Sequence, residues 1–405
     1  MSSKPQTFLC ISCYFKGEDF LKSCKAAGNT VYLLTVKSLE HADWPRDSVD
    51  EFFYMESDEN SAENYQQLTL GMAHVMRERS IDRIVALDDF DVEKAAYLRE
   101  EFRIPGMGQT TARYFRDKLA MRIKAEEEGI PVPAFTGLFN NEAIHAYCQR
   151  VPAPWILKPR AEASTTGMKK IYSEEELWSA INGLGEERHR YLLESFKPGD
   201  VYHADALTVD GEVVFCRVSK YLATPFEVAH GGGIFRSMIL PYGSEEDQAL
   251  QALNTQVLSG FGMQFSASHT EFIRCHEDGK YYFLETSSRV GGAHLAEMVE
   301  AGSGISLWGE WAKIETAKAL GTPYTLPTPR NDYAGILVSL SRFQHPDQGP
   351  FQAPEVVWRL QKDYHVGMIV QSPDRDRLRS LLDEYAQIVH EHYHASAPVG
   401  DKSSN

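Results

Sequence analysis

The chain has 405 residues, six cysteines without disulfide-like spacing, and a formal net charge of −16. Its lysines and arginines are scattered and no apolar run approaches the roughly eighteen residues of a membrane span, so neither nucleic acid nor a membrane is an expected partner. No signal segment opens the chain, and at about 150 residues per domain we expect a cytoplasmic protein of two or three domains.

The first hundred or so residues alternate short apolar runs with amphipathic stretches. This alternation predicts a β-α-β beginning and a parallel sheet. The expected strands are 7–12, 31–35 and 84–87, and the expected helices are 20–27, 64–78 and 92–102. Neither a Gly-x-Gly-x-x-Gly fingerprint nor a Walker phosphate loop occurs in this part. We therefore predict an N-terminal α/β domain over residues 1–115.

The middle of the chain holds most of the residues that suggest chemistry. One long charged helix is expected over 110–128, and a loop is expected over 221–236. After the Pro-rich stretch 322–330, an expected strand at 335–339 and a helix at 375–392 predict a small C-terminal α+β domain over 319–405. Its polar last residues are expected to be frayed.

Two acidic residues belong to a predicted β-hairpin. Glu271 lies in one apolar segment and Glu285 ends the next, with the polar turn 276–279 between them. The two carboxylates should therefore lie side by side on adjacent strands. Magnesium binds through one or two carboxylates and phosphate oxygens, and Arg289 follows with a guanidinium fork. The hairpin thus predicts a magnesium-nucleotide site.

Two upstream segments suit a nucleotide but are individually weak. Lys158 leaves an expected strand at 154–160, ahead of a small-residue turn at 163–167 whose hydroxyls and amides suit phosphates. The expected strand 190–196 opens a turn whose backbone groups suit adenine. A lone strand-end lysine is usually solvated, and a lone strand and turn are usually structural. The order of the segments, rather than any one of them, carries the hypothesis.

Five motifs follow one another: Arg116-Asp117-Lys118, Lys158 with its turn, Glu194 to Phe196, Glu271, and Glu285 to Arg289. In this order they resemble the ATP-grasp superfamily. The resemblance implies an α/β and α+β architecture of three domains, with a central two-lobed ATP-grasp domain over 116–318 whose lobes are 116–189 and 190–318. It also implies ATP and one or two Mg²⁺ ions, or Mn²⁺ in their place.

The resemblance further implies a role for each matching residue. Contacts with the nucleotide are implied for Lys118 and Lys158 at the phosphates, for the lid residues Ser164, Thr165, Thr166 and Gly167, and for Glu194 and Phe196 at the adenine hinge. Metal ligation is implied for Glu271, Glu285 and Ser287, and steadying of the transferred phosphoryl group for Arg289. Ser287 stands where the family usually has asparagine, and Val201 where many members have a ribose-binding glutamate.

Glu227 and His230 precede a run of three glycines. Glu-x-x-His in this position resembles the substrate loop of the ATP-grasp L-amino acid ligases. It implies that Glu227 pairs with a substrate ammonium and that His230 orients or deprotonates the attacking amine. The alternative is a surface loop with a merely polar histidine. His269, near Glu271, is interpreted as a structural histidine.

The function implied is that of a carboxylate-amine ligase. ATP would phosphorylate a substrate carboxylate, and an amine would attack the acylphosphate to form an amide, releasing ADP and phosphate. The expected partners are a small-molecule acid and amine, amino acids first, and a homodimer through the N-terminal domain would be ordinary. Two alternatives stay open: a biotin carboxylase-like enzyme that activates bicarbonate, and an ATP-binding module without catalysis.

Overall fold

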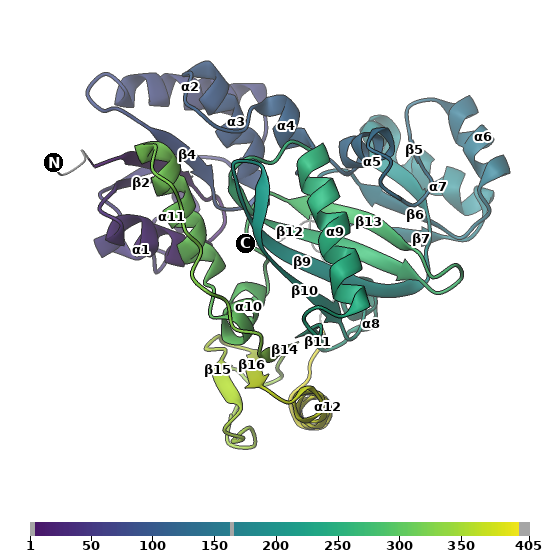
Figure 1. Ribbon diagram of the computed structural model, residues 1–405. Coiled ribbons are helices and arrows are strands. Elements are labelled where there is room, and N and C mark those ends of the chain that lie inside the picture. The colour runs from purple at the N-terminus through teal and green to yellow at the C-terminus, as the bar shows by residue number, and fades with distance from the viewer. Residues whose placement is uncertain (1–4, 163–165, 397–405) are drawn as a thin grey trace.

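The computed structural model describes residues 5–162 and 166–396, and the strands in these ranges form three sheets (Figure 1). Within these ranges, no helix is long and apolar enough to cross a lipid bilayer. The six cysteines all fall in the described ranges and are free thiols, as their spacing predicted.

The N-terminal sheet is parallel, with the strand order β3-β2-β1-β4, which confirms the predicted β-α-β arrangement. Its strands are β1 (Thr7–Ile11), β2 (Thr30–Val36), β3 (Glu51–Met55) and β4 (Arg83–Ala86). Helices α2 (Ala62–Val75) and α3 (Val92–Glu101) cover one face, and α1 (Glu18–Ala26) covers the other. The sequence did not predict β3, because this edge strand is half-exposed along most of its length and shows no alternation.

A helix from the middle of the chain completes the second face of this sheet. The helix α11 (Leu307–Leu320) packs beside α1 (Figure 1). The rings of Trp311 and Phe20 lie 4.9 Å apart between them, at an edge-on angle. A buried ion pair joins Arg83 of β4 to Glu315 of α11. The N-terminal sheet is therefore fixed to the rest of the molecule by both apolar and ionic contacts.

The second sheet is small and antiparallel, with the order β5-β8-β6-β7. Its strands are β5 (Phe135–Gly137), β6 (Trp155–Pro159), β7 (Lys169–Ile171) and β8 (Tyr191–Ser195). Helices α6 (Asn141–Arg150) and α7 (Glu174–Leu184) pack on it, and the side chains of Asn140 and Ser173 cap their N-termini. Strand β6 carries Lys158, as predicted.

The expected single helix over 110–128 is wrong. The segment forms two helices, α4 (Gln109–Arg113) and α5 (Lys118–Glu127). The carboxylate of Asp117 accepts hydrogen bonds from the amides of Leu119 and Ala120, so it starts a new helix at Lys118. The break places Lys118 at a helix start, where its amide donates to the carbonyl of Arg160.

The third sheet is antiparallel and has the order β13-β12-β9-β10-β11-β14-β16-β15. Its strands are β9 (Gly199–Val209), β10 (Glu212–Tyr221), β11 (Phe235–Ile239), β12 (Ser266–Cys275), β13 (Tyr281–Ser287), β14 (Tyr333–Leu340), β15 (Val356–Arg359) and β16 (His365–Ser372). Because β11 pairs with β14, the sheet continues across residue 318. The predicted boundary there falls between strands of one sheet, and the division into three domains stays a prediction.

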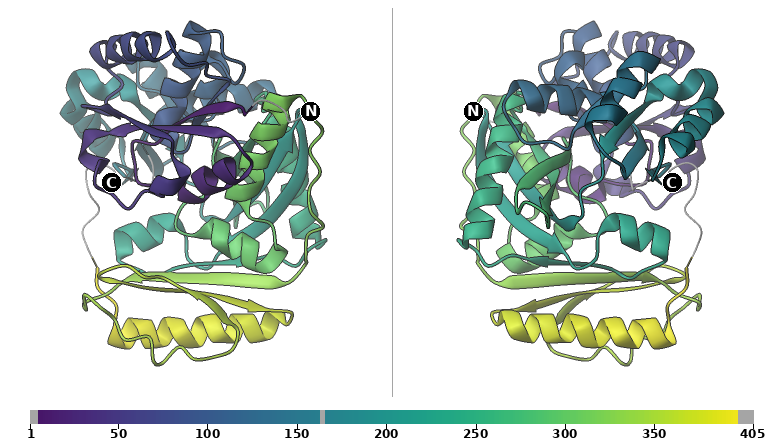
Figure 2. Two further views of the ribbon diagram at one scale, coloured as in Figure 1. Left: turned by 90° about the vertical axis from the view of Figure 1, so that its left-hand side faces the viewer. Right: turned by 90° about the vertical axis from the view of Figure 1, so that its right-hand side faces the viewer.

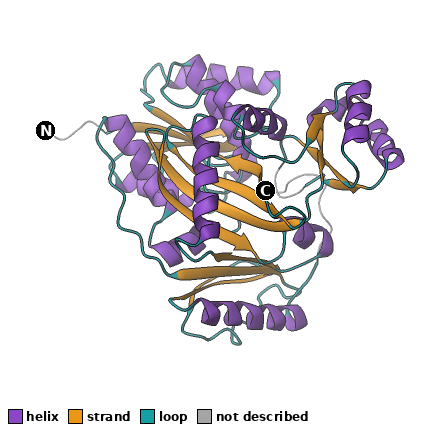
Figure 3. Ribbon diagram, turned by 45° about the vertical axis from the view of Figure 1, so that its right-hand side comes forward, coloured by secondary structure: helices purple, strands orange, loops and turns teal. Residues whose placement is uncertain are grey.

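Helices cover both faces of this sheet (Figures 2 and 3). The helix α9 (Glu245–Gly260) packs on the strands around β9 and β10. Over β14 and β16, α10 (Leu295–Ser303) lies on one face and α12 (Arg375–His392) on the other. The bounds of α12 equal those predicted, because its apolar positions recur at helical spacing and Asp374 caps it.

The segment 221–236 is not simply a loop. It contains the short helix α8 (Pro225–Gly231), which Thr224 begins with a capping box: its hydroxyl accepts from the amide of Glu227, and the carboxylate of Glu227 accepts from the amide of Thr224. A proline at the first helical position adds to this signal. The sequence therefore contained the signal for this helix start, but the following glycines favoured a loop.

Candidate active site

The predicted hairpin is present, and it places the two carboxylates opposite each other on adjacent strands. In the antiparallel register of β12 and β13, Glu271 lies directly across from Glu285. Glu271 accepts a hydrogen bond from the hydroxyl of Tyr221 at 2.8 Å, and Glu285 pairs with Nζ of Lys118 at 2.9 Å. Burial opposes ionisation of Glu285, but the charges of Lys118 and Lys158 outweigh it and lower its pKa. The hairpin thus offers adjacent carboxylates held by groups from other elements.

A buried triad lies beside this pair. Nζ of Lys158 is 2.5 Å from Oε1 of Glu194, and the other oxygen of Glu194 accepts from Nε and Nη2 of Arg122 at 3.1 and 2.9 Å. Burial, together with the charges of Arg122 and Lys118, lowers the pKa of Lys158 to about 8 against the opposing pull of Glu194. The side chain of Glu194 therefore positions Lys158, a contact that the adenine-hinge role did not include.

The predicted lid and hinge are only partly visible. Ser164 and Thr165 lie outside the described residues, whereas Thr166 is buried and Gly167 has a φ of +70°. Phe196 follows β8, and its ring lies under Nζ of Lys170, 3.5 Å from the ring centroid. Its amide donates to the carbonyl of Pro154. The roles of these residues as lid and hinge stay predictions.

Arg289 reaches from the end of β13 to the N-terminal sheet. Its guanidinium forms a two-pronged ion pair with Oδ2 of Asp89, with Nε at 2.9 Å, and donates to the carbonyl of Val290 at 2.7 Å. Asp89 begins the 3₁₀ turn η3 (Asp89–Asp91), just past the carboxyl end of β4. Burial opposes ionisation of Asp89, but Arg289 and Arg116 hold its pKa well below the usual range. The sequence showed two aspartates at this strand end but not their partner.

A network of buried polar groups lies beside Glu271. Oδ2 and Oδ1 of Asp205 lie 2.6 and 2.8 Å from Nδ1 of His203 and of His269. Because an ionised carboxylate only accepts, both imidazoles donate to it. Burial lowers the pKa of His269, but Asp205 and then Glu271, 3.7 Å from its Nε2, raise it to about 10. This raised pKa favours an imidazolium beside Glu271, and the interpretation of His269 as a structural histidine stays a prediction.

The sequence offered a signal for this network. His203 and Asp205 are two residues apart in β9 and therefore lie on the same face, and the same holds for His269 and Glu271 in β12. The backbone of Gly291 packs closely against this network, because a Cβ at Gly291 would lie only 2.8 Å from Nδ1 of His269 and 2.9 Å from Oδ1 of Asp205. In the described part of the chain, His203, Asp205 and His269 are also the three-residue group whose ligand atoms are close enough for a metal ion. Their mutual hydrogen bonds already account for them.

The remaining predicted residues take different positions. Glu227 is exposed and its carboxylate accepts from the amide and hydroxyl of Thr224. His230 belongs to α8, but its side chain lies outside the described part of the structure. Ser287 ends β13 directly across from His269. The predicted roles of these three residues in substrate and metal binding stay predictions.

The predicted residues divide between two adjoining cavities. The first, of about 320 Å³, is lined by Lys118, Lys158, Thr166, Glu194, Phe196 and Glu227 together with the apolar side chains of Ile156, Val201 and Leu284. The second, of about 300 Å³, is lined by Asp89, Arg116, Ser287 and Arg289. Lys118, Glu271 and Glu285 line both cavities, so the two carboxylates form a shared wall with Lys118 beside them.

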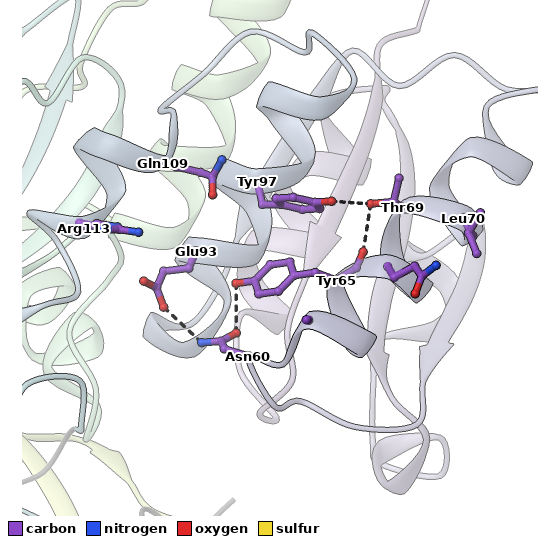
Figure 4. A pocket seen from close by; sticks show the side chains of 10 residues that line it. Asn60, Tyr65, Thr69, Leu70, Glu93, Tyr97, Gln109 and Arg113 are labelled. Atoms are coloured by element: carbon purple, nitrogen blue, oxygen red, sulfur yellow. Dashed lines mark hydrogen bonds between the residues drawn. The ribbon is translucent and has the colours of Figure 1, made fainter. Parts of the chain in front are cut away.

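Another cavity, of about 630 Å³, lies in the N-terminal part (Figure 4). Its polar side chains bond to one another: the hydroxyl of Tyr97 is 2.8 Å from Oγ1 of Thr69, and the amide of Asn60 donates to Glu93. None of the residues that the sequence singled out lines it. We therefore place the candidate active site at the carboxylate wall.

The chain is similar to known proteins in both sequence and fold. No family model matches the chain. Over 243 residues, it is 30% identical to the L-arginine-specific L-amino acid ligase of Bacillus subtilis, and the match covers 58% of each chain. It is 31% identical over 217 residues to the D-alanine–D-alanine ligase of Ralstonia pickettii, covering 52% of this chain and 66% of the enzyme. The chain thus matches less than two thirds of the length of either curated relative.

The fold similarity extends further than the sequence similarity. The crystal structure of an L-amino acid ligase from Bacillus licheniformis superposes with a TM-score of 0.76, at 15% identity, over 97% of this chain and 99% of that one. Nearly the whole chain therefore shares one fold with that enzyme. The similarity to these ligases, in sequence over part of the chain and in fold over nearly all of it, confirms the predicted resemblance to the ATP-grasp superfamily.

Proposed function

We propose that this protein is an ATP- and magnesium-dependent carboxylate-amine ligase that joins an amino acid to a second amino acid or small amine. The observation that carries the proposal is the wall formed by Glu271 and Glu285, with Lys158 on one side, Arg289 on the other and Lys118 lining both cavities. This arrangement suits a metal phosphate between a nucleotide cavity and a substrate cavity. The matches to two ligases of amino acids support the same reaction class.

The side chains of the first cavity fit a nucleotide. Ile156, Val201 and Leu284 offer apolar walls for a base, and Lys118 and Lys158 offer charge to phosphates. Glu271 and Glu285 are oxygen donors of the kind that Mg²⁺ prefers, and the bound ion would neutralise phosphate charge. Val201, which packs against Tyr221 and Ile273, is apolar and offers the ribose no hydrogen bond.

The proposed reaction has two transfers. A substrate carboxylate attacks the γ-phosphorus of ATP, forming an acylphosphate and releasing ADP; the amine then attacks the acyl carbon, loses a proton and expels phosphate. The main barrier to the first transfer is repulsion between two anions, which Lys118, Lys158 and Arg289 offset in a site of low dielectric. Thr166 and Gly167, beside the cavity, belong to the segment proposed to exclude water from the acylphosphate.

The test is phosphate release from ATP and magnesium in the presence of pairs of amino acids. We expect release that needs both substrates and that Glu285→Ala or Arg289→Ala abolishes. The control is Glu277→Ala, an exposed carboxylate in the turn of the same hairpin, which should leave the rate unchanged. Mass spectrometry of the product should show the dipeptide or amide.

The same assay separates the alternatives. Phosphate release that requires bicarbonate rather than an amine would replace the proposal with a carboxylase-type activation. Tight binding of ATP with no phosphate release from any pair would favour a binding module without catalysis. A homodimer through the N-terminal sheet stays a prediction, which sedimentation of the purified chain tests.

A further inference from the structure

Arg116 is a buried cation in the second cavity that forms no ion pair with a described residue. It lies between α4 and α5, its side chain is among the buried residues at 7% exposure, and it lines the cavity together with Asp89 and Arg289. Its guanidinium carbon is 4.3 Å from the centroid of the Phe90 ring, which in turn stacks on Tyr14. This stack fixes the plane of the guanidinium.

The neighbouring cations are all paired. Lys118 pairs with Glu285, Lys158 and Arg122 with Glu194, and Arg289 with Asp89. Among the residues that the structure describes, Arg116 forms no ion pair, because Asp89, whose pKa its charge lowers, pairs with Arg289. The buried Nε of Arg116 has no hydrogen-bond partner. Burying an unpaired guanidinium is costly, so this arrangement is typical of a group that meets an anionic ligand.

The cavity also holds a buried acceptor without a partner. Asp89 gives Oδ2 to Arg289, whereas its Oδ1 accepts no hydrogen bond. A free donor on Arg116 and a free acceptor on Asp89 in one cavity suit a ligand that carries both an anion and an ammonium. The α-carboxylate and α-amine of an amino acid have this chemistry.

We propose that Arg116 binds a carboxylate of the amino-acid substrates through its guanidinium fork. This inference rests on the proposed function for its substrate class, and it adds a binding residue on the side of the wall away from the nucleotide. The carboxylate is either the one that becomes activated or that of the amino acid that supplies the amine. Both present the same two oxygens to the fork.

The first experiment measures binding without turnover. The full chain is saturated with magnesium and AMP-PNP, and each of the twenty standard amino acids, in the L form where chiral, is screened by thermal shift. Calorimetry then compares the best binder with its primary amide, which lacks the carboxylate. In the wild type we expect the amide to bind at least about tenfold more weakly. Arg116→Gln should lower the affinity for the amino acid about 10- to 100-fold, as loss of a charge-assisted pair does, and leave that for the amide within twofold.

Two further variants guard against misfolding. Arg116→Lys keeps the charge but loses the planar fork, so it should give a smaller loss. Arg113→Gln removes an exposed arginine three residues away and should change nothing. AMP-PNP binding reports the fold of each variant. The proposal is overturned if amino-acid affinity is unchanged in both Arg116 variants, if the wild type does not distinguish acid from amide, or if no L-amino acid binds.

Turnover then identifies which carboxylate is bound. If Arg116→Gln raises the KM of the amine donor alone, and the amide of that donor is insensitive to the substitution, Arg116 holds the donor's carboxylate; a raised KM for the other substrate assigns the activated one. Binding through Arg116 without phosphate release from any pair would refute the ligase but keep this site. Phosphate release with unchanged KM values in Arg116→Gln would refute this site but keep the ligase.

Discussion

The affinity for ATP should fall as the pH rises from 7 to 9, because Lys158 loses its proton in this range. The side chain is buried at 4% exposure, and burial lowers its pKa to about 8 although Glu194 lies beside it. With that pKa, Lys158 is about 90% protonated at pH 7 and about 10% protonated at pH 9. If phosphates bind only the protonated lysine, the apparent dissociation constant rises about tenfold between these pH values.

Because nucleotide binding is linked to the protonation of Lys158, the number of protons taken up on binding is a second measurable quantity. Phosphate oxygens next to Lys158 would raise its pKa in the complex, so binding takes up protons between the two pKa values. At pH 8 the expected uptake is about half a proton per nucleotide, rising toward one at pH 9. Calorimetric titration with magnesium and AMP-PNP in two buffers of different ionisation enthalpy measures this number.

Lys158→Arg is the matched control, because a guanidinium stays charged at every pH in this range. Its affinity should be independent of pH from 7 to 9, and its binding should take up no proton. A wild type with pH-independent affinity, or the same pH dependence in Lys158→Arg, would refute the assignment of Lys158 to the phosphates.

Three further predictions concern the groups around the site. Glu194→Gln leaves two buried cations without their carboxylate and should cost about 3–5 kcal/mol in urea unfolding, whereas Glu187→Gln, which breaks an exposed ion pair, should change little; equal losses would contradict this. Asp205→Asn removes the shared acceptor of two imidazoles and should lower the Tm by several degrees, with the more exposed Asp200→Asn as a control that should not. Thr224→Ala removes a capping box worth about 0.5–2 kcal/mol, so amide exchange in α8 should accelerate; unchanged protection would show that the cap contributes nothing.

Local sequence patterns predicted the parts of the site that local interactions form. The opposed pair of Glu271 and Glu285 followed from two apolar segments and a polar turn, since a hairpin register is set by its turn. Lys158 was correctly placed on a strand because its segment is an apolar run. The bounds of α12 followed from helical spacing over 18 residues.

The parts that were missed depend on contacts between distant segments. Arg289 and its partner Asp89 are separated by 200 residues, and no periodicity reports such a pair. The break before Lys118 arises partly because Asp117 also pairs with Arg160, 43 residues away. The division of the residues into two cavities likewise depends on how the N-terminal sheet meets the hairpin, which a single sequence does not contain.

The ion pairs of the site suggest why it would prefer a metal phosphate over either ion alone. Lys118 forms an ion pair with Glu285. A phosphate that binds Lys118 would therefore leave Glu285 as an unpaired carboxylate in a buried wall, and a cation that binds Glu285 would leave Lys118 unpaired. A ligand that brings both charges satisfies both partners at once, so the exchange of ion pairs costs least for the metal-nucleotide complex. Arg116 differs from these groups because it forms no ion pair that a ligand would have to break, although its charge acts on Asp89. Its ligand therefore gains a charge-assisted contact without breaking one, which suits a small substrate that has few other groups to bind with.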